Sequence, residues 1–300
     1  MAVLAGLRVE HRRWIASHGP LLDELRRQLS DDEFTAAVVE LILELDPQVE
    51  SPVSARQEAR RLLSLMLANS EVAIRLLSSG ARVIVIPRHV RMTDIPPFER
   101  LRGRLLEGES AGGRCWDAVR GSGGLQSAVT EENLLGEISS VAGEISVYAH
   151  GYSTTTHEIA HTIHQYGLTD ADRVAIHEAY LEKRSTSEEW PDGSRPYRKL
   201  DGKWVQMENY SSSNELEYFA QLTNAYLGTN HGVDSFTKEP RNNGIGWVCK
   251  NEKRLLPILE RIYGKNPSKP DGAANAVATT TLHSETLEAI RQLFQDSAMD

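Results

Sequence analysis

Residues 157–161 read HEIAH, an HExxH stretch in which two histidines stand four positions apart. An α-helix turns once every 3.6 residues, so His157 and His161 lie on one face of a helix and can close on a single small cation. Glu158 is rotated off that line and would lie beside the cation, where a general base for an activated water belongs. The stretch therefore predicts a zinc-binding helix.

The neighbouring residues favour a helix around this pair. Thr155, followed three positions later by Glu158, has the capping-box pattern, and Gly167 is a good C-terminal stop. The same pattern has a second interpretation, in which the Glu158 carboxylate only satisfies the backbone of the first helical turn. The stretch alone leaves both roles of Glu158 open.

A zinc site that keeps one position for water takes three protein ligands, so the two histidines need a partner. The candidates are His164, His150 and Glu217. His164 shares the helix face, but it lies about 4.5 Å further along the axis than His161, too far to converge easily on one ion. We expect His164 to orient a neighbouring side chain by a hydrogen bond instead. Glu217, on a second helix, can approach the ion from another side.

A second informative stretch lies downstream. Residues 210–220 read YSSSNELEYFA, so Tyr210 stands seven positions before Glu217. Together with HExxH, this stretch resembles the active site of the gluzincin zinc metallopeptidases, in particular the catalytic domain of anthrax toxin lethal factor. The match is local to the two stretches, and residues 1–80 show no resemblance.

The resemblance implies a reaction and a set of roles. The reaction would be hydrolysis of a peptide bond by a water that Zn²⁺ activates, with Glu158 as the base. The Tyr210 hydroxyl would face the metal and donate a hydrogen bond to the charge that develops on the carbonyl oxygen. The zinc ligands would be His157, His161 and Glu217.

The chain departs from the family pattern at one position. The family carries a further acidic residue four positions after the ligand, where this chain has Gln221. Glutamine accepts a hydrogen bond but brings no charge, so we expect a weaker affinity for zinc. For Glu217 a capping role, and for Tyr210 a role as a plain loop aromatic, remain the alternatives.

The composition bounds the class of protein. Three hundred residues, 40% hydrophobic and 25% charged, describe an ordinary globular chain. The net charge of −9 argues against a nucleic-acid partner. No apolar run reaches the roughly eighteen residues that span a bilayer. Charged residues interrupt residues 1–14 before a long apolar core forms, so we expect no signal peptide there. Cys115 and Cys249 permit one disulfide without demanding it, and we expect free thiols.

The first part of the chain is expected to be helical. A capping box at Ser30 opens a helix that we expect to reach Pro47, and further helices begin near Ser54 and Ser70. Residues 1–80 would form a helical N-terminal lobe.

A sheet is expected to begin after this lobe. Residues 83–86 are a β-branched run that predicts a buried strand, and residues 144–149 alternate as a second one. The second strand leads into His150, for which contact with substrate and exposure to solvent are both open. Between residues 103 and 136 the glycine-rich composition predicts a surface loop rather than a phosphate cradle. Asp-Gly within residues 198–205 predicts a hairpin, either a flap over the cleft or a plain connection.

Apolar spacing and turn residues predict four further helices, over about 169–183, 214–228, 255–263 and 284–294. The predicted fold is α+β and helix-rich, a zincin-like metallopeptidase with a small mixed sheet and an HExxH helix. Its catalytic domain would span residues 81–264, and residues 265–300 would form a linker and a C-terminal helix.

The biological role has several hypotheses. The partner would be a protein or peptide substrate, and the protein would be made in the cytoplasm and delivered or secreted by a specialised machinery as a toxin or effector. A housekeeping or regulatory bacterial peptidase is the first alternative. A catalytically silent, zinc-stabilised binding module is the second, and the presence of both Glu158 and Tyr210 disfavours it.

Overall fold

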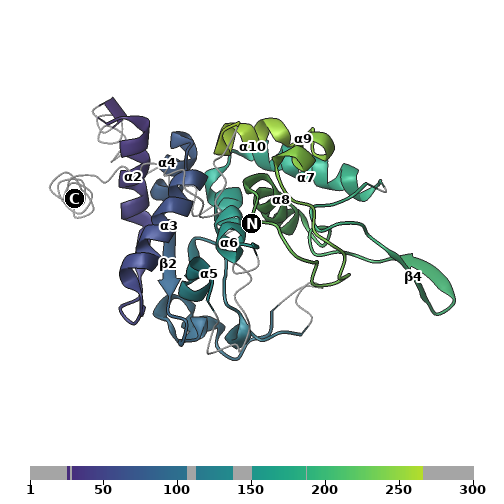
Figure 1. Ribbon diagram of the computed structural model, residues 1–300, viewed down its shortest axis with the longest axis horizontal. Helices are drawn as coiled ribbons and strands as arrows, with labels where there is room; N and C mark the ends of the chain where they lie inside the picture. The colour runs from purple at the N-terminus through teal and green to yellow at the C-terminus, as the bar shows by residue number, and fades with distance from the viewer. Residues whose placement is uncertain (1–25, 28, 107–112, 138–150, 187, 266–300) are drawn as a thin grey trace.

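The computed structural model describes residues 26–27, 29–106, 113–137, 151–186 and 188–265 (Figure 1). Helices surround a small parallel sheet, and a separate two-stranded hairpin extends from the body (Figure 1). The helix-rich α+β prediction is confirmed, with parallel and antiparallel pairing in two separate sheets. The strand expected at residues 144–149, His150 and the helix expected at 284–294 lie outside the described residues.

Three short strands form the parallel sheet. They are β1 (Leu43–Leu45), β2 (Arg82–Ile86) and β3 (Gln126–Thr130), in the order β1-β2-β3. Leu43 pairs with Val83 in the parallel register. The strand predicted at residues 83–86 is therefore present, and it occupies the centre of the sheet.

The central strand β2 is buried on both faces. Val83 and Val85 belong to the main hydrophobic cluster, whereas Ile84 and Ile86 face a smaller cluster around Phe98. Side chains alternate between the faces of a strand, so burial of both faces selects a continuous apolar run. This is why the sequence shows four β-branched residues together instead of an alternating pattern.

The helices before β2 are α2 (Asp31–Ile42), α3 (Pro52–Met66) and α4 (Ser70–Ser78). The capping box of Ser30 is confirmed, because its side chain accepts from the Glu33 N–H and the Glu33 carboxylate reaches back to the Ser30 N–H. The extension of this helix to Pro47 is wrong, since the chain turns into β1 after α2. Pairing with a strand some forty residues later overrides the local helical spacing.

The remaining helices build the second half of the molecule. They are α5 (Glu131–Leu135), α6 (Thr154–Thr162), α7 (Asp170–Arg184), α8 (Glu215–Leu227), α9 (Ile245–Asn251) and α10 (Leu256–Tyr263). Short 3₁₀ turns cover Met92–Asp94, Pro96–Leu101 and Trp116–Ala118. One hydrophobic cluster runs from Phe34 in α2 to Tyr263 in α10, so the N-terminal helices share a core with the rest. The domain division at residue 80 stays a prediction.

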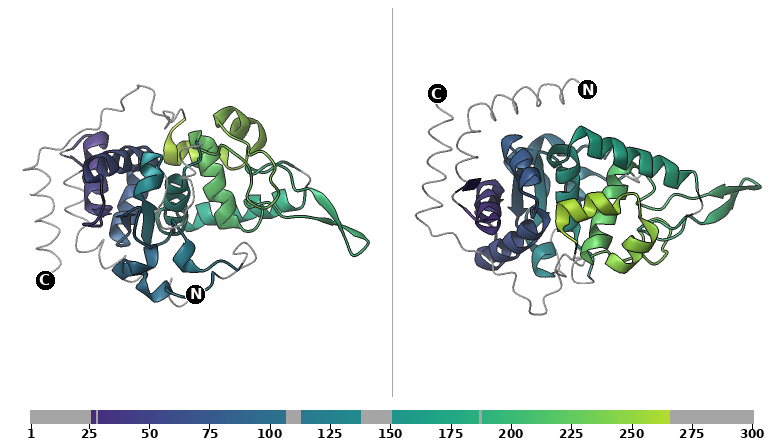
Figure 2. Two further views of the ribbon diagram at one scale, coloured as in Figure 1. Left: turned by 60° about the horizontal axis from the view of Figure 1, so that its bottom comes forward. Right: turned by 90° about the horizontal axis from the view of Figure 1, so that it is seen from above.

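The hairpin consists of β4 (Tyr197–Leu200) and β5 (Lys203–Gln206). Asp201 and Gly202 join the strands with φ angles of 47° and 83°, the left-handed conformation that a tight hairpin turn requires. The predicted hairpin is confirmed. It extends away from the body in all three views instead of folding back over it as a flap (Figures 1 and 2).

Two smaller expectations concern the described part of the chain. Cys115 and Cys249 are free thiols, as expected. In the residues that the structure describes, no helix is both long and apolar enough to traverse a lipid bilayer.

Candidate metal centre

Helix α6 presents the HExxH residues. Its N-cap is Ser153, whose hydroxyl accepts from the Thr156 N–H at 3.0 Å. The capping box predicted between Thr155 and Glu158 is wrong, because the N-cap lies two residues earlier, at Ser153, and both predicted residues lie inside the helix. The Glu158 carboxylate is therefore not used to cap the helix, and the capping interpretation of this residue falls away.

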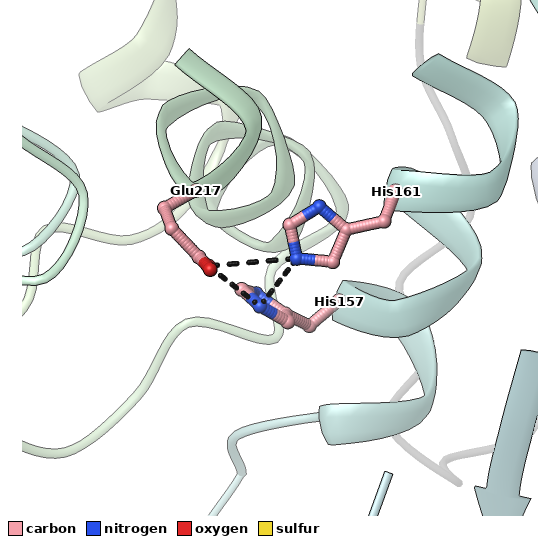
Figure 3. A group of neighbouring side chains, drawn as sticks. All are labelled: His157, His161 and Glu217. Carbon is pink, nitrogen blue, oxygen red and sulfur yellow. Dashed lines mark hydrogen bonds and ion pairs between the residues drawn. The ribbon is translucent and has the colours of Figure 1, made fainter. Parts of the chain in front are cut away.

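Helix α8 presents Glu217. Asn214 caps this helix as predicted, its side chain accepting from the N–H groups of Leu216 and Glu217 at 3.0 Å each. Because Asn214 caps the backbone, the Glu217 carboxylate is free to turn toward α6 (Figure 3). Helices α6 and α8 pack against each other, which brings together residues some sixty positions apart.

Three ligand-type atoms converge between these helices (Figure 3). The Nε2 atoms of His157 and His161 are 3.0 Å apart, and Glu217 Oε2 lies 3.0 Å from the first and 3.5 Å from the second. Zinc bonds of 2.0–2.1 Å in a tetrahedron place neighbouring ligand atoms about 3.3 Å apart. The three side chains therefore fit a single zinc ion.

The charges of this group also favour a bound cation. Glu217 Oε2 is buried and accepts no conventional hydrogen bond from the described residues, while it faces the two imidazoles as an ion-pair partner. Burial alone would lower the pKa of His157, but the neighbouring Glu217 carboxylate raises it overall. The two histidines in turn hold the pKa of Glu217 well below its usual range, against the effect of burial. The space between the three side chains thus stabilises positive charge, which a divalent cation supplies.

A chain of hydrogen bonds fixes the orientation of His157. Its Nδ1 lies 3.1 Å from Gln221 Oε1, and Gln221 Nε2 donates to both oxygens of Asp192 at 2.7 and 2.8 Å. The carboxylate of Asp192 can only accept, so it fixes the amide orientation and leaves Oε1 toward the imidazole. His157 must then donate from Nδ1, which leaves the Nε2 lone pair for a metal.

Gln221 carries no charge, but Asp192, the next residue in the hydrogen-bond chain from His157, does. Asp192 is fully buried, pairs with Arg241 at 2.9 Å and accepts from the Ser211 N–H at 2.8 Å. The Arg241 guanidinium also lies 4.2 Å from the centre of the Tyr152 ring, and the Tyr152 hydroxyl donates to Gln221 Oε1. The hydrogen-bond network that orients His157 therefore includes a carboxylate, which lies on a loop and not on α8.

Glu158 is half-buried and lies next to the three converging side chains. Burial raises the pKa of this carboxyl, against the opposing effects of His157, His161 and the Gly123 N–H. Gly123 is required here, because a Cβ at this position would lie 2.4 Å from the His161 Cβ. A Cβ at Gly121 would also come within 3.1 Å of the Glu158 side chain. The glycine-rich segment predicted as a surface loop thus packs against Glu158 and His161 of α6.

Tyr210 lies beside His157, with the centres of the two rings 5.8 Å apart. Its backbone N–H donates to Asp234 at 2.9 Å, and its ring packs edge-on against Phe236 at 5.4 Å. Burial and the neighbouring Glu217 carboxylate raise the pKa of Tyr210 well above its usual value. The phenol therefore stays protonated at neutral pH and can act as a hydrogen-bond donor.

His164 lies in a π-helical turn, Ile163–Gly167, that directly continues α6. Its ring packs against Phe219 at 5.3 Å, and neither ring nitrogen has a hydrogen-bond partner among the described residues. The expectation that His164 orients a neighbour by a hydrogen bond is therefore wrong. Burial lowers its pKa to about 4, so it is a neutral core side chain.

Asp192, Tyr152 and Arg241 carry no motif in the sequence that marks them as part of the site. Tyr152 and Asp192 contact Gln221, and Arg241 pairs with Asp192. The hydrogen bond from Gln221 to Asp192 joins residues 29 positions apart. The one available signal is Gln221 itself, since a glutamine in place of a carboxylate leaves a histidine in need of a partner. The glycine-rich composition around Gly123 is visible in the sequence, but it does not indicate that α6 packs against this glycine.

Comparison with solved structures gives a distant likeness in fold. No family model matches the chain, and no curated protein matches it. Among solved structures, the chain is similar to the Pro-Pro endopeptidase PPEP-2 from Paenibacillus alvei. The two share 15% identity with a TM-score of 0.47, over 75% of this chain and 100% of that chain. At this level of likeness, the interpretation of the site rests on its own geometry, and the lethal-factor resemblance rests on the sequence motifs.

Proposed function

We propose that this protein is a zinc-dependent endopeptidase whose metal ligands are His157, His161 and Glu217. The observation that carries the proposal is the convergence of their three ligand atoms within 3.0–3.5 Å, on two packed helices. Glu158 and Tyr210 flank this point from different elements, as a base and a hydrogen-bond donor would. A zinc ion held there would act as a Lewis acid that polarises a peptide carbonyl and acidifies water.

Glu158 would move the proton. Its carboxylate would take a proton from the attacking water and would then deliver it to the amine that leaves. Its raised pKa suits this exchange, because a base whose pKa lies closer to neutrality also gives the proton up again. The Gly123 N–H holds the carboxylate in place without neutralising it.

Tyr210 would stabilise the developing oxyanion. Its phenol remains protonated and lies beside His157, so it can donate to an oxygen bound near the three ligands. Asp234 and Phe236 hold the backbone and the ring from behind. A donor that is already in place costs no reorganisation when charge develops.

The narrower role is also a proposal. The lethal-factor resemblance of residues 157–161 and 210–220 supports a delivered toxin or effector that cleaves a protein in another cell. A housekeeping or regulatory bacterial peptidase uses the same chemistry and differs only in its target. A silent zinc-stabilised module would not need Glu158 and Tyr210 in these positions.

The test is cleavage in a complex mixture. Purified, zinc-loaded protein is incubated with a proteome, and new peptide termini are read by mass spectrometry beside a Glu158→Gln control. We expect a set of termini with shared flanking residues in the wild-type sample alone. Identical termini in both samples, or none with metal-loaded wild type, would contradict the proposal.

A further inference from the structure

The β4–β5 hairpin exposes large apolar side chains far from the metal centre. Every residue of both strands is exposed except Gln206, which is half-buried. The exposed apolar side chains, with their exposed fractions, are Trp204 (70%), Tyr197 (61%), Leu200 (49%) and Val205 (42%). The ribbon extends away from the body (Figure 2). Four exposed apolar side chains so close together are typical of an interaction site.

The strand register divides these residues between both faces of the ribbon. Tyr197 pairs with Gln206 and Lys199 with Trp204, so the two aromatic residues share one face. Leu200 pairs with Lys203, and Val205 pairs with Arg198 on the other face. Residues paired across strands lie on the same side of a sheet. Each face therefore carries two apolar side chains and at least one cation.

The charge of the hairpin is opposite to that of the whole chain. Residues 197–206 contain Arg198, Lys199 and Lys203 against Asp201 alone, a net charge of +2 in a chain of net charge −9. Among the described residues, none forms an ion pair with any of these three cations. The cations are thus available to an anionic partner.

The base of the hairpin is firmly held. The Met207 N–H donates to Pro196 O at 2.8 Å where the strands meet the body. Arg195 and Arg184 both pair with Glu208 at 3.0 and 2.8 Å, directly after β5. The ribbon is therefore a supported projection and not a loose loop.

We propose that the β4–β5 hairpin docks the protein on an anionic lipid surface. A flat protein partner would cover one face of the ribbon and leave the other face exposed, whereas a bilayer interface surrounds both. Trp and Tyr favour the headgroup level of a bilayer, and Lys and Arg stems can lie along apolar surface while their charges reach anionic headgroups. The hairpin enters the interface with Trp204, Tyr197, Leu200 and Val205, and its three cations contact the headgroups.

The experiment is vesicle co-sedimentation of the full chain. Phosphatidylcholine vesicles with and without phosphatidylserine are compared at low and high salt, and no peptidase activity is needed. We expect binding that requires phosphatidylserine and weakens with salt. Tryptophan emission should shift to the blue on binding, and Trp204→Phe should remove this shift while the protein still binds.

Two pairs of variants separate the hairpin from general effects. Lys199→Gln with Lys203→Gln should lower binding roughly 25-fold, at about fivefold per cation. Lys250→Gln with Lys253→Gln removes the same charge from another exposed site and should leave binding unchanged.

For the apolar contribution, Trp204→Ala should lower vesicle binding by about tenfold or more. Leu181→Ala is its control, at an exposed apolar position on α7, and should have no effect. All variants lie at exposed positions, and circular dichroism verifies that each one folds.

Three outcomes would overturn the proposal. The first is equal vesicle binding, or equal absence of binding, by wild type and the hairpin variants. The second is binding to poly-L-glutamate, but not to vesicles, that the lysine variants remove, which would indicate an acidic protein partner. The third is a vesicle-free dimer in analytical ultracentrifugation that Trp204→Ala dissociates, which would assign the ribbon to a second copy of the chain.

Discussion

The candidate metal centre and the β4–β5 hairpin depart from the usual arrangement of a folded chain in opposite directions. Between α6 and α8 the protein buries polar and charged groups, such as Asp192, Gln221 and His157. On the hairpin it exposes aromatic and aliphatic side chains, above all Trp204. Neither arrangement is the one that folding alone favours.

The two departures differ in what they demand of their surroundings. A buried polar group costs free energy unless each donor and acceptor is paired, so the centre needs every partner of its network. An exposed apolar side chain needs no partner among its neighbours. The effect of a substitution should therefore extend to neighbouring residues in the candidate metal centre and remain local on the hairpin.

The largest effect is expected at Glu158. Glu158→Gln keeps the size of the side chain but removes the base, so peptide cleavage should fall about 10²–10⁴-fold. Zinc content should remain that of the wild type, because Glu158 is not among the three converging ligands. Turnover at the wild-type rate in a metal-loaded Glu158→Gln protein would remove Glu158 from the mechanism.

The next effect concerns stability against acid. The folded-state pKa of His164 is about 4, below the ordinary value of 6.5 expected for the unfolded chain. Below pH 6.5 the unfolded chain binds the proton more readily, so this residue lowers stability as the pH falls from 6.5 to 4. His164→Leu should remove up to about 3 kcal/mol of that loss. Urea unfolding of both proteins in the same metal state, at several pH values, measures the difference.

Parallel unfolding curves for wild type and His164→Leu across this range would show that His164 is not buried in its neutral form. The comparison with the hairpin is direct, because Trp204, Leu200 and Val205 carry no titratable group. The pH dependence of the free energy of unfolding should therefore arise from buried groups such as His164 and not from these hairpin side chains.

A smaller effect is expected at Asp192. Asp192→Asn removes the charge behind Gln221 and His157, and zinc affinity in chelator competition should fall about 10–100-fold. Adding Gln221→Glu moves a carboxylate next to the histidine and should restore part of the affinity. Gln221→Glu alone would place two buried carboxylates in contact and should not.

Asp234→Asn is the matched control for this experiment. Asp234 is also fully buried, but it accepts from the Tyr210 N–H and not from Gln221. Its zinc affinity should stay close to wild type. If Asp192→Asn and Asp234→Asn weaken zinc equally, the effect is general destabilisation and the hydrogen-bond chain carries no special role.

Local signals in the sequence sufficed for several elements. Ser30 with Glu33, and Asn214, mark helix starts that the structure contains, because a cap acts within three residues. Asp201-Gly202 marks the hairpin turn for the same reason, since the required backbone conformation belongs to these two residues.

Contacts between residues far apart in the chain determine the features that local sequence signals do not predict. Leu43–Leu45 has helical spacing but forms a strand, because β2 is available to pair with it. In the candidate site, residues 157–161 and 210–220 indicate the ligands, the base and the phenol, and the structure brings them together. Asp192 escaped prediction because only the folded chain brings its loop to α8.

The smallest effect is expected on the hairpin. Trp204→Ala should change the free energy of unfolding by no more than about 0.5 kcal/mol, because the side chain is exposed and packs against no core cluster. Chemical denaturation measures it, beside the buried Trp190→Phe as the contrasting case. A loss of several kcal/mol on Trp204→Ala would mean that the ribbon is part of the fold's stability and not a free docking surface.

The most direct test of the metal centre is the zinc content of Glu217→Ala, measured by mass spectrometry of the metal after gel filtration. We expect one zinc per wild-type chain, one in Glu158→Gln and in His164→Ala, and none in Glu217→Ala. One zinc retained in Glu217→Ala together with its loss in His164→Ala would mean that the third ligand is His164 and not Glu217.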